Sequence, residues 1–291
     1  MYASSKNRRF IAIALLPGLA VFVLFAVVPI FWSVYYGFFE WKGIGAARFI
    51  GLANYREILH DPIFWRALKN NLILVASAII GQIPVALVLA ILLKRNRWFH
   101  RLVRSAVFLP MVLSTVVVGL IWGYMYHPQF GLVNAALEML GLDRWTRAWL
   151  SDPKVNMYAV SIPINWSNIG PYMVIFIAAL SGISPEIDDA AAIDGATGFR
   201  KLFSVTLPMI WGTVVVCLVL CISGSLKAFD HVIVMTGGGP AQSTELLATY
   251  MYNNSFYIYR YGYGSAVSTM IILISAILIV LNRLITRRGG M

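Results

Sequence analysis

The stretch PEIDDAAAIDGATGFRKLFSVTLP, from Pro185 to Pro208, is a dense group of charges in a chain that is otherwise mostly apolar. It predicts a short helix, because Pro185 suits the first helical position and Ser184 before it can cap the helix. Three consecutive alanines favour the helical conformation, and Gly195 stands where a helix end takes a left-handed residue. We therefore expect a folded, charged element that joins two apolar segments.

The composition of the whole chain is that of a membrane protein. Of its 291 residues, 59% are hydrophobic and only 12% are charged, whereas about a quarter are charged in ordinary soluble domains. A bilayer core takes roughly 20 apolar residues per helix, so there is room for about six spans with modest loops. The expected fold is all-α, a polytopic membrane protein with about six transmembrane helices.

Apolar runs set the positions of these spans. They cover about residues 10–38, 70–93, 105–127, 155–183, 202–226 and 261–282. The expected domains are an N-terminal segment 1–9, a transmembrane domain 10–286 and a C-terminal tail 287–291. The first run is too long for a signal-peptide core of about 7–15 residues, so we interpret it as an uncleaved span. The mixed segment from Glu40 to Lys69 is expected to be external.

The positive charge indicates orientation. The net charge of +11 also fits a nucleic-acid-binding protein, but in membrane proteins Lys and Arg collect at cytoplasmic ends. The segment KRNRWFHRLVR, from Lys94 to Arg104, holds five basic residues and no acid. We interpret it as a cytoplasmic loop, with a nucleic-acid or lipid-headgroup site as the alternative. Alternation of six spans then places both termini in the cytoplasm.

Enzyme and metal chemistry find little support in the sequence. Cys217 and Cys221 lie four residues apart in an apolar run, which favours packing between helices over a metal pair. The cluster TGGGP at Thr236–Pro240 lacks the Lys-Ser/Thr pair of a phosphate loop, and no GxxxxGK[ST] pattern occurs elsewhere. A membrane-embedded enzyme acting on lipid-linked sugars would need clustered acids or histidines, and the only acid cluster is the one in 185–208. We expect no enzyme activity and no metal site.

The charged stretch matches a known pattern. DAAAIDGA at Asp189–Ala196, followed by VTLP at Val205–Pro208, resembles the EAA loop of binding-protein-dependent ABC importer permeases. That loop reads Glu-Ala-Ala, three residues, Gly, nine residues, Ile, one residue, Leu-Pro. The spacing is kept here, with Asp189 in place of Glu and Val205 in place of Ile.

A second block narrows the resemblance. FDHVIVMTGGGPAQST at Phe229–Thr244, GLANY at Gly51–Tyr55 and the pair Leu109-Pro110 look like the carbohydrate-uptake branch of that family. Within it they are most similar to the first permease of maltose- and glycerol-phosphate-type systems. The resemblance covers nearly the whole chain.

The resemblance implies a coupling role for the helix at residues 184–195, which would dock on a separate ATPase subunit from the cytoplasmic side. The residues assigned to this role are Glu186, Asp188, Asp189, Ala190, Ala191, Asp194 and Gly195. The partners implied are a second permease subunit in a heterodimer, two ATP-binding subunits that hold ATP and Mg, and an extracytoplasmic solute-binding protein. The location implied is the cytoplasmic (inner) membrane of a bacterium or archaeon.

The function implied is import of a sugar, a di- or oligosaccharide or a sugar or polyol derivative, by alternating access. A stand-alone ion-coupled secondary transporter is the alternative, and it would need a charged residue central in a span, which the sequence lacks.

Polar groups and helix breakers in the fourth and fifth runs suggest where substrate passes, because lipid cannot satisfy them. The expected pathway residues are Asn165, Trp166, Asn168, Tyr172, Cys221, Ser225 and Lys227. Trp166 and Tyr172 offer aromatic platforms for a sugar ring. The alternative is that these residues only join helices through hydrogen bonds and small-residue contacts.

Overall fold

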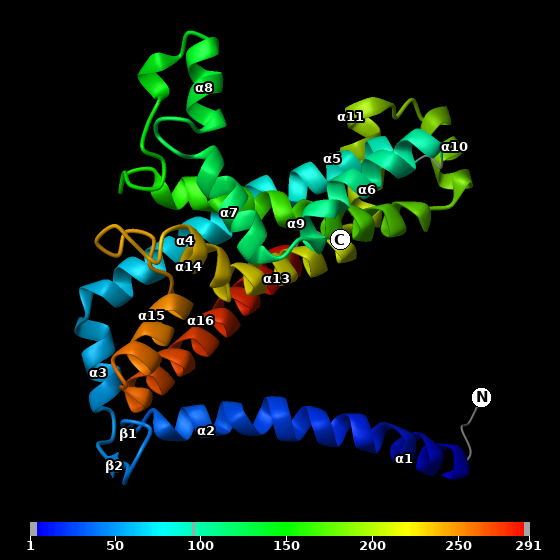
Figure 1. Ribbon diagram of the computed structural model, residues 1–291. Helices are drawn as coiled ribbons and strands as arrows, with labels where there is room; N and C mark the ends of the chain where they lie inside the picture. The colour runs from blue at the N-terminus through cyan, green and yellow to red at the C-terminus, as the bar shows by residue number, and fades with distance from the viewer. Residues whose placement is uncertain (1–4, 95–96, 288–291) are drawn as a thin grey trace. The chain divides into compact units, whose positions relative to one another are not determined.

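The computed structural model describes residues 5–94 and 97–287 (Figure 1). The described chain is mainly helical, with one pairing of two short strands, which confirms the all-α prediction. It divides into two compact units, the first formed by Met1–Asp61 with Met251–Ile272 and the second by Pro62–Tyr250 with Leu273–Met291. Of the predicted terminal segments 1–9 and 287–291, residues 1–4 and 288–291 lie outside the described residues, and residues 5–9 already belong to the first helix.

The first unit is built around a short hairpin. Its elements are α1 (Ser5–Phe22), a π-helical turn (Val23–Val27), α2 (Val28–Tyr36), β1 (Phe39–Glu40), β2 (Arg48–Phe49), α3 (Ala53–His60), a second π-helical turn (Asn253–Tyr257) and the first part of α16 (Tyr261–Arg287). The two strands are antiparallel, with Phe39 opposite Phe49. The Asn54 amide donates to the carbonyls of Gly37 and Phe39 at 2.9 and 3.0 Å, which holds α3 against the hairpin.

The second unit holds most of the helices. They are α4 (Pro62–Gly81), α5 (Ile83–Leu93), α6 (Trp98–Val112), α7 (Thr115–Met125), α8 (Leu132–Met139), a 3₁₀ turn (Asp143–Trp145), α9 (Asn156–Ser181), α10 (Pro185–Ile193), α11 (Gly198–Lys201), a π-helical turn (Leu202–Thr206), α12 (Leu207–Met209), α13 (Trp211–Leu226), α14 (Asp230–Met235) and α15 (Leu247–Tyr252). The main core joins α5, α9 and α13, where Ala86 and Ala90 are fully buried beside Met173 and Phe176. Small residues four apart let helices in a membrane approach closely.

Three helices in the described chain are long and apolar enough to cross a membrane: Ala14–Tyr36, Pro62–Leu93 and Tyr261–Thr286. The number rises to six if each sharply bent helix pair forms one span. The bend between α6 and α7 is 99°, and the bend before α13 is 76°. These lengths agree with a polytopic membrane protein.

Two helices begin earlier than the sequence predicts. The second span is expected from residue 70, whereas α4 begins at Pro62 and runs without a break through Lys69. Residues 62–69 are therefore helical and continuous with the candidate span Pro62–Leu93. The reason is that Pro62 suits a helix start, no Gly or Pro follows before Gly81, and Phe64 and Ala67 bury one face. Likewise the basic segment is already helical from Trp98.

Prolines shape the apolar helices, because each lacks an N–H and leaves the carbonyl four residues earlier without its helical partner. At Pro163 that carbonyl belongs to Ala159, and the Tyr126 hydroxyl donates to it at 3.1 Å. At Pro29 and Pro208 the chain widens instead, since a π-helical turn ends two residues before each proline. The side-chain hydrogen bond and the π-helical turn each allow a proline within a membrane helix, where lipid offers no hydrogen bond to the backbone.

The contact between α6 and α9 depends on Gly170. A Cβ atom at this position would lie 2.7 Å from the Phe108 Cα and 2.8 Å from the Val107 oxygen. Gly170→Ala should therefore force the two helices apart at a cost of about 1–3 kcal/mol. We expect the apparent melting temperature in detergent to fall by several degrees. Gly123→Ala is the control, since open space surrounds that position, and equal melting of the two variants would contradict the packing.

Candidate functional site

The charged stretch forms an exposed helix with a fixed end. At the end of α10 the N–H of Gly195 bonds to the Ala192 carbonyl at 3.1 Å, and that of Ala196 to the Ala191 carbonyl at 2.8 Å. This pair of bonds is a Schellman motif. Gly195 has φ +68°, which confirms the left-handed residue that the sequence predicts. Ala191 and Ala196, the two residues joined by the longer of these turns, are both buried.

The start of α10 differs in one detail from the prediction. Pro185 occupies the first turn, as expected, and Ser184 precedes the helix with an extended backbone. Its side chain, however, makes no capping hydrogen bond to the backbone, so that part of the prediction is wrong. The Ser184 hydroxyl donates a hydrogen bond to the carboxylate of Glu186 instead. This bond, together with one from the backbone N–H of Glu186, lowers the pKa of Glu186. The carboxylate therefore remains charged at neutral pH.

Most residues assigned to coupling lie on the surface. Glu186, Asp189, Ala190 and Asp194 are exposed, together with Gly195. The methyl group of Ala191 points inward and helps to close the helix end, so it is not part of an accessible face. The side chain of Asp188 lies outside the described part of the chain.

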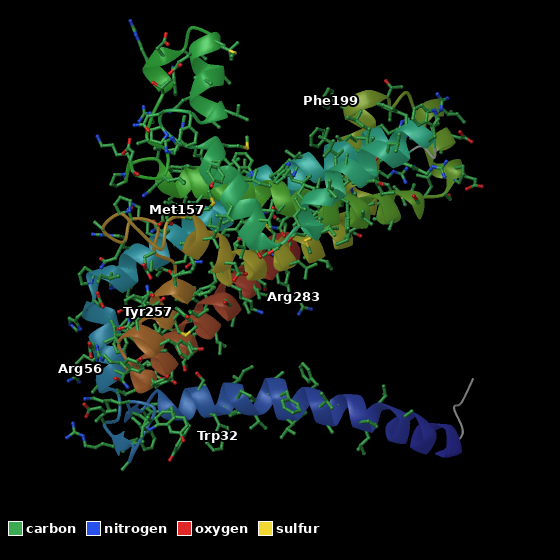
Figure 2. The ribbon with its side chains drawn as sticks, in the orientation of Figure 1. Trp32, Arg56, Met157, Phe199, Tyr257 and Arg283 are labelled. Carbon is green, nitrogen blue, oxygen red and sulfur yellow. The ribbon has the colours of Figure 1, made fainter. Side chains whose placement is uncertain are left out.

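Two apolar side chains at this end escape the sequence analysis. Ile193 is 86% exposed and Phe199 is 82% exposed. Phe199 belongs to α11 at one end of the second unit, while α8 lies toward another (Figures 1 and 2). Large apolar groups at the surface mark contact sites when they gather together. Composition could not reveal them, because apolar residues are common everywhere in this chain.

A polar cavity of about 200 Å³ lies among α5, α7, α9, α13 and α14. It is lined by Gln82, Thr115, Ile164, Asn168, Tyr172, Cys221, Gly224, Ser225, Lys227, Ala228, Phe229, Asp230 and His231. We call it the central cavity. Five of the residues expected along a pathway line it, namely Asn168, Tyr172, Cys221, Ser225 and Lys227. The fold thus gathers residues that lie about 60 positions apart in sequence.

The other two expected pathway residues do not line the central cavity. Asn165 accepts a hydrogen bond of 2.9 Å from the Gln82 amide and donates to the Ser77 carbonyl at 3.2 Å. Trp166 packs edge-on against Trp122, with ring centroids 6.0 Å apart. Asn165 therefore supports the wall through Gln82, and Trp166 joins two helices.

The cavity also holds groups that sequence reasoning missed. Gln82, Thr115, Asp230 and His231 come from segments that only packing brings together. The His231 side chain is 9% exposed, and its Nε2 atom has no hydrogen-bond partner. Burial lowers the pKa of His231, against a smaller opposing effect of the Asp230 charge. A neutral imidazole is thus available to exchange a hydrogen bond with a guest molecule.

The cysteines behave as packing residues. Cys217 and Cys221 are buried with free thiols, and both belong to the core between α5, α9 and α13. Within residues 5–94 and 97–287, no group of three or more His, Cys, Asp or Glu side chains is arranged to hold a metal ion.

Comparison with known proteins agrees with this architecture. Residues 82–289 match the family described as binding-protein-dependent transport system inner membrane component. The chain is 35% identical over 276 residues to the probable ABC transporter permease protein PH1215 of Pyrococcus horikoshii, with 94% of each chain covered. It is 33% identical to the diacetylchitobiose uptake system permease protein NgcF of Streptomyces coelicolor, covering 94% of this chain and 80% of the relative.

A solved structure shares the fold. It is that of a bacterial alginate ABC transporter in complex with an alginate pentasaccharide-bound periplasmic protein, and one of its chains superposes with a TM-score of 0.82 at 23% identity, covering 98% of this chain and 96% of that one. The likeness extends over both units taken in chain order. The family match over residues 82–289 and the two relatives together show that the chain belongs to the family of binding-protein-dependent transport system inner membrane components.

Proposed function

We propose that this chain is the permease subunit of an ATP-driven importer that carries a saccharide or a sugar or polyol derivative into the cytoplasm. The observation that carries the proposal is the exposed α10–α11 segment, in which a rigid acidic helix is followed by a left-handed glycine. Ile193 and Phe199 on this segment are almost fully exposed. Such a surface suits a cleft on another protein, because apolar anchors surrounded by charges are typical of interfaces.

The energy source is proposed to lie on other chains. The sequence has no phosphate-binding loop, and in this proposal two ATP-binding subunits hold ATP and Mg and dock against α10 and α11. Closure of the nucleotide-bound pair would push the helix as a rigid body. The Schellman motif supports this role, since it fixes the helix end to the next segment.

The remaining partners follow from the same scheme. The α10–α11 side and both termini are proposed to face the cytoplasm, and a solute-binding protein would deliver substrate on the opposite side. A second permease subunit would complete the pathway. In support, none of the apolar window in Ala14–Tyr36 is buried within this chain, which leaves this span free to pack against lipid or against a second permease subunit.

Substrate is proposed to pass through the central cavity. Its lining combines amide, hydroxyl and imidazole groups with the ring of Tyr172, and sugars are recognised by polar groups of this kind beside aromatic faces. The uptake of diacetylchitobiose by the system of the relative NgcF supports a saccharide as the class of substrate.

The coupling assignment is tested with Gly195→Val. This position is left-handed, and a β-branched residue there is strained by about 1–2 kcal/mol, which should displace the end of α10. We expect the complex to assemble and hydrolyse ATP, while uptake in proteoliposomes falls at least tenfold. Gly141→Val is the matched control, because Gly141 has φ +70° and equally open surroundings but lies on the α8 side.

Normal uptake by Gly195→Val would refute the coupling role. Uptake by this chain alone under an ion gradient would support a secondary transporter instead.

The pathway assignment is tested by filling the central cavity. Gly224 lines it, and a Cβ at this position meets no atom within 4 Å. Gly224→Leu should occupy the space without disturbing the helix, and we expect uptake to drop at least tenfold with unchanged assembly. Gly212→Leu on the same helix is the control, since Gly212 is equally open and lies outside the cavity lining. Equal uptake by the two variants would rule out this route.

A further inference from the structure

A second cavity lies at the end of α9 that is farthest from α10. Its volume is about 560 Å³. It is lined by Arg66, Lys69, Asn70, Ile73, Pro153, Lys154, Met157, Tyr158, Pro240, Ala241 and Ser243. We call it the basic cavity, and Met157, labelled in Figure 2, marks its α9 side. Ligand sites usually have volumes of roughly 300–1,000 Å³.

The walls of the basic cavity are one face of α4, the start of α9 and the loop at residues 240–243, which hydrogen bonds hold in place. The α4 residues lie at positions 66, 69, 70 and 73, the spacing of one helix face. Arg66 donates to the Ala241 carbonyl at 2.7 Å, and the Asn70 amide donates to the carbonyls of Ser243 and Glu245 at 2.9 Å each. On the other side, Asn156 is completely buried and donates to the Ser243 hydroxyl at 2.6 Å. The loop is thus held by both helices.

The charge in this cavity is of one sign. Arg66, Lys69 and Lys154 line it, and no carboxylate does. Among the described residues, neither lysine side chain forms an ion pair. Cations gathered in a recess raise the local concentration of anions, because low-dielectric walls focus their field.

The uncharged part of the lining favours an organic guest. Ile73, Met157 and the two prolines add apolar surface to the lining, and Tyr158, which also lines the cavity, is 56% exposed. Inorganic phosphate would gain nothing from apolar surface, whereas a pyranose ring presents C–H groups to aromatic faces and hydroxyls to amides. From charge and lining together, we infer that the basic cavity binds the anionic group of an acidic saccharide, with the sugar ring against Tyr158.

The inference rests on the proposed function and extends it. The basic and central cavities share α4–α5, α9 and the segment after α13 as walls. Ile73 precedes Gln82 by nine residues, and Met157 precedes Ile164 by seven, which corresponds to about 10–13 Å along a helix. An acidic saccharide held outside would thus lie roughly two helical turns from the central cavity, where Lys227 offers the next cation.

The test uses the full-length chain in nanodiscs of zwitterionic lipid. Binding is measured by titration calorimetry at low and high salt. The ligands are disaccharides of glucuronate, galacturonate and mannuronate, each compared with the neutral disaccharide of the same linkage. We expect at least one acidic disaccharide to bind tenfold more tightly than its neutral counterpart, with an affinity that falls as salt rises. The variant Lys69→Gln/Lys154→Gln should lose this preference. Arg56→Gln/Arg144→Gln removes the same charge from exposed positions elsewhere and should keep it.

Two results would overturn the inference. One is the absence of any acidic preference across the three pairs, or its survival in the lysine double variant. The other is loss of acidic disaccharide binding when phosphatidylglycerol is added to the nanodiscs, which would assign the cavity to a lipid headgroup. Because no ATPase is present in this assay, its failure is distinct from failure of the coupling role, which Gly195→Val tests.

Discussion

The structure depends on one constraint, which is that lipid offers no hydrogen bonds to a broken helix. Pro163 frees the Ala159 carbonyl, and the Tyr126 hydroxyl from another helix satisfies it. The short break between α4 and α5 brings Gln82 inward, where its amide donates to Asn165. At these two breaks a neighbouring segment supplies the hydrogen-bond partner. Gln82 also lines the central cavity, so its side chain serves both the helix packing and the cavity wall.

The same constraint shapes the charged stretch at the other end of the bundle. A Schellman motif closes α10 at Gly195, and a π-helical turn absorbs Pro208 just before α13 begins. From Ile193 and Phe199 the chain leads through α11 and α12 into α13, whose far end lines the central cavity through Ser225. This connection gives a physical route from a docked motor to the proposed substrate path.

Sequence reasoning succeeded where one residue type alone suits a position. Gly195 was identifiable because only glycine readily adopts its backbone, and polar residues inside apolar runs marked the walls of the central cavity. It failed where a residue did not differ in type from its sequence neighbours. Ile193 and Phe199 resemble the many apolar residues around them, and α4 continues through Lys69 because a helix can carry charges at its end. His231 and Thr115 join the cavity only through packing between distant segments, which local patterns do not encode.

The central claim is that α10 and α11 contact an ATP-binding subunit. It is tested most directly by placing a photo-crosslinking amino acid at Phe199 in intact membranes and identifying the adduct by mass spectrometry. We expect an adduct with an ATP-binding protein whose yield changes when ATP is trapped, and no such adduct from Leu140, which is 73% exposed beside α8. An adduct with lipid alone at Phe199, or the same ATP-binding partner at both positions, would contradict it.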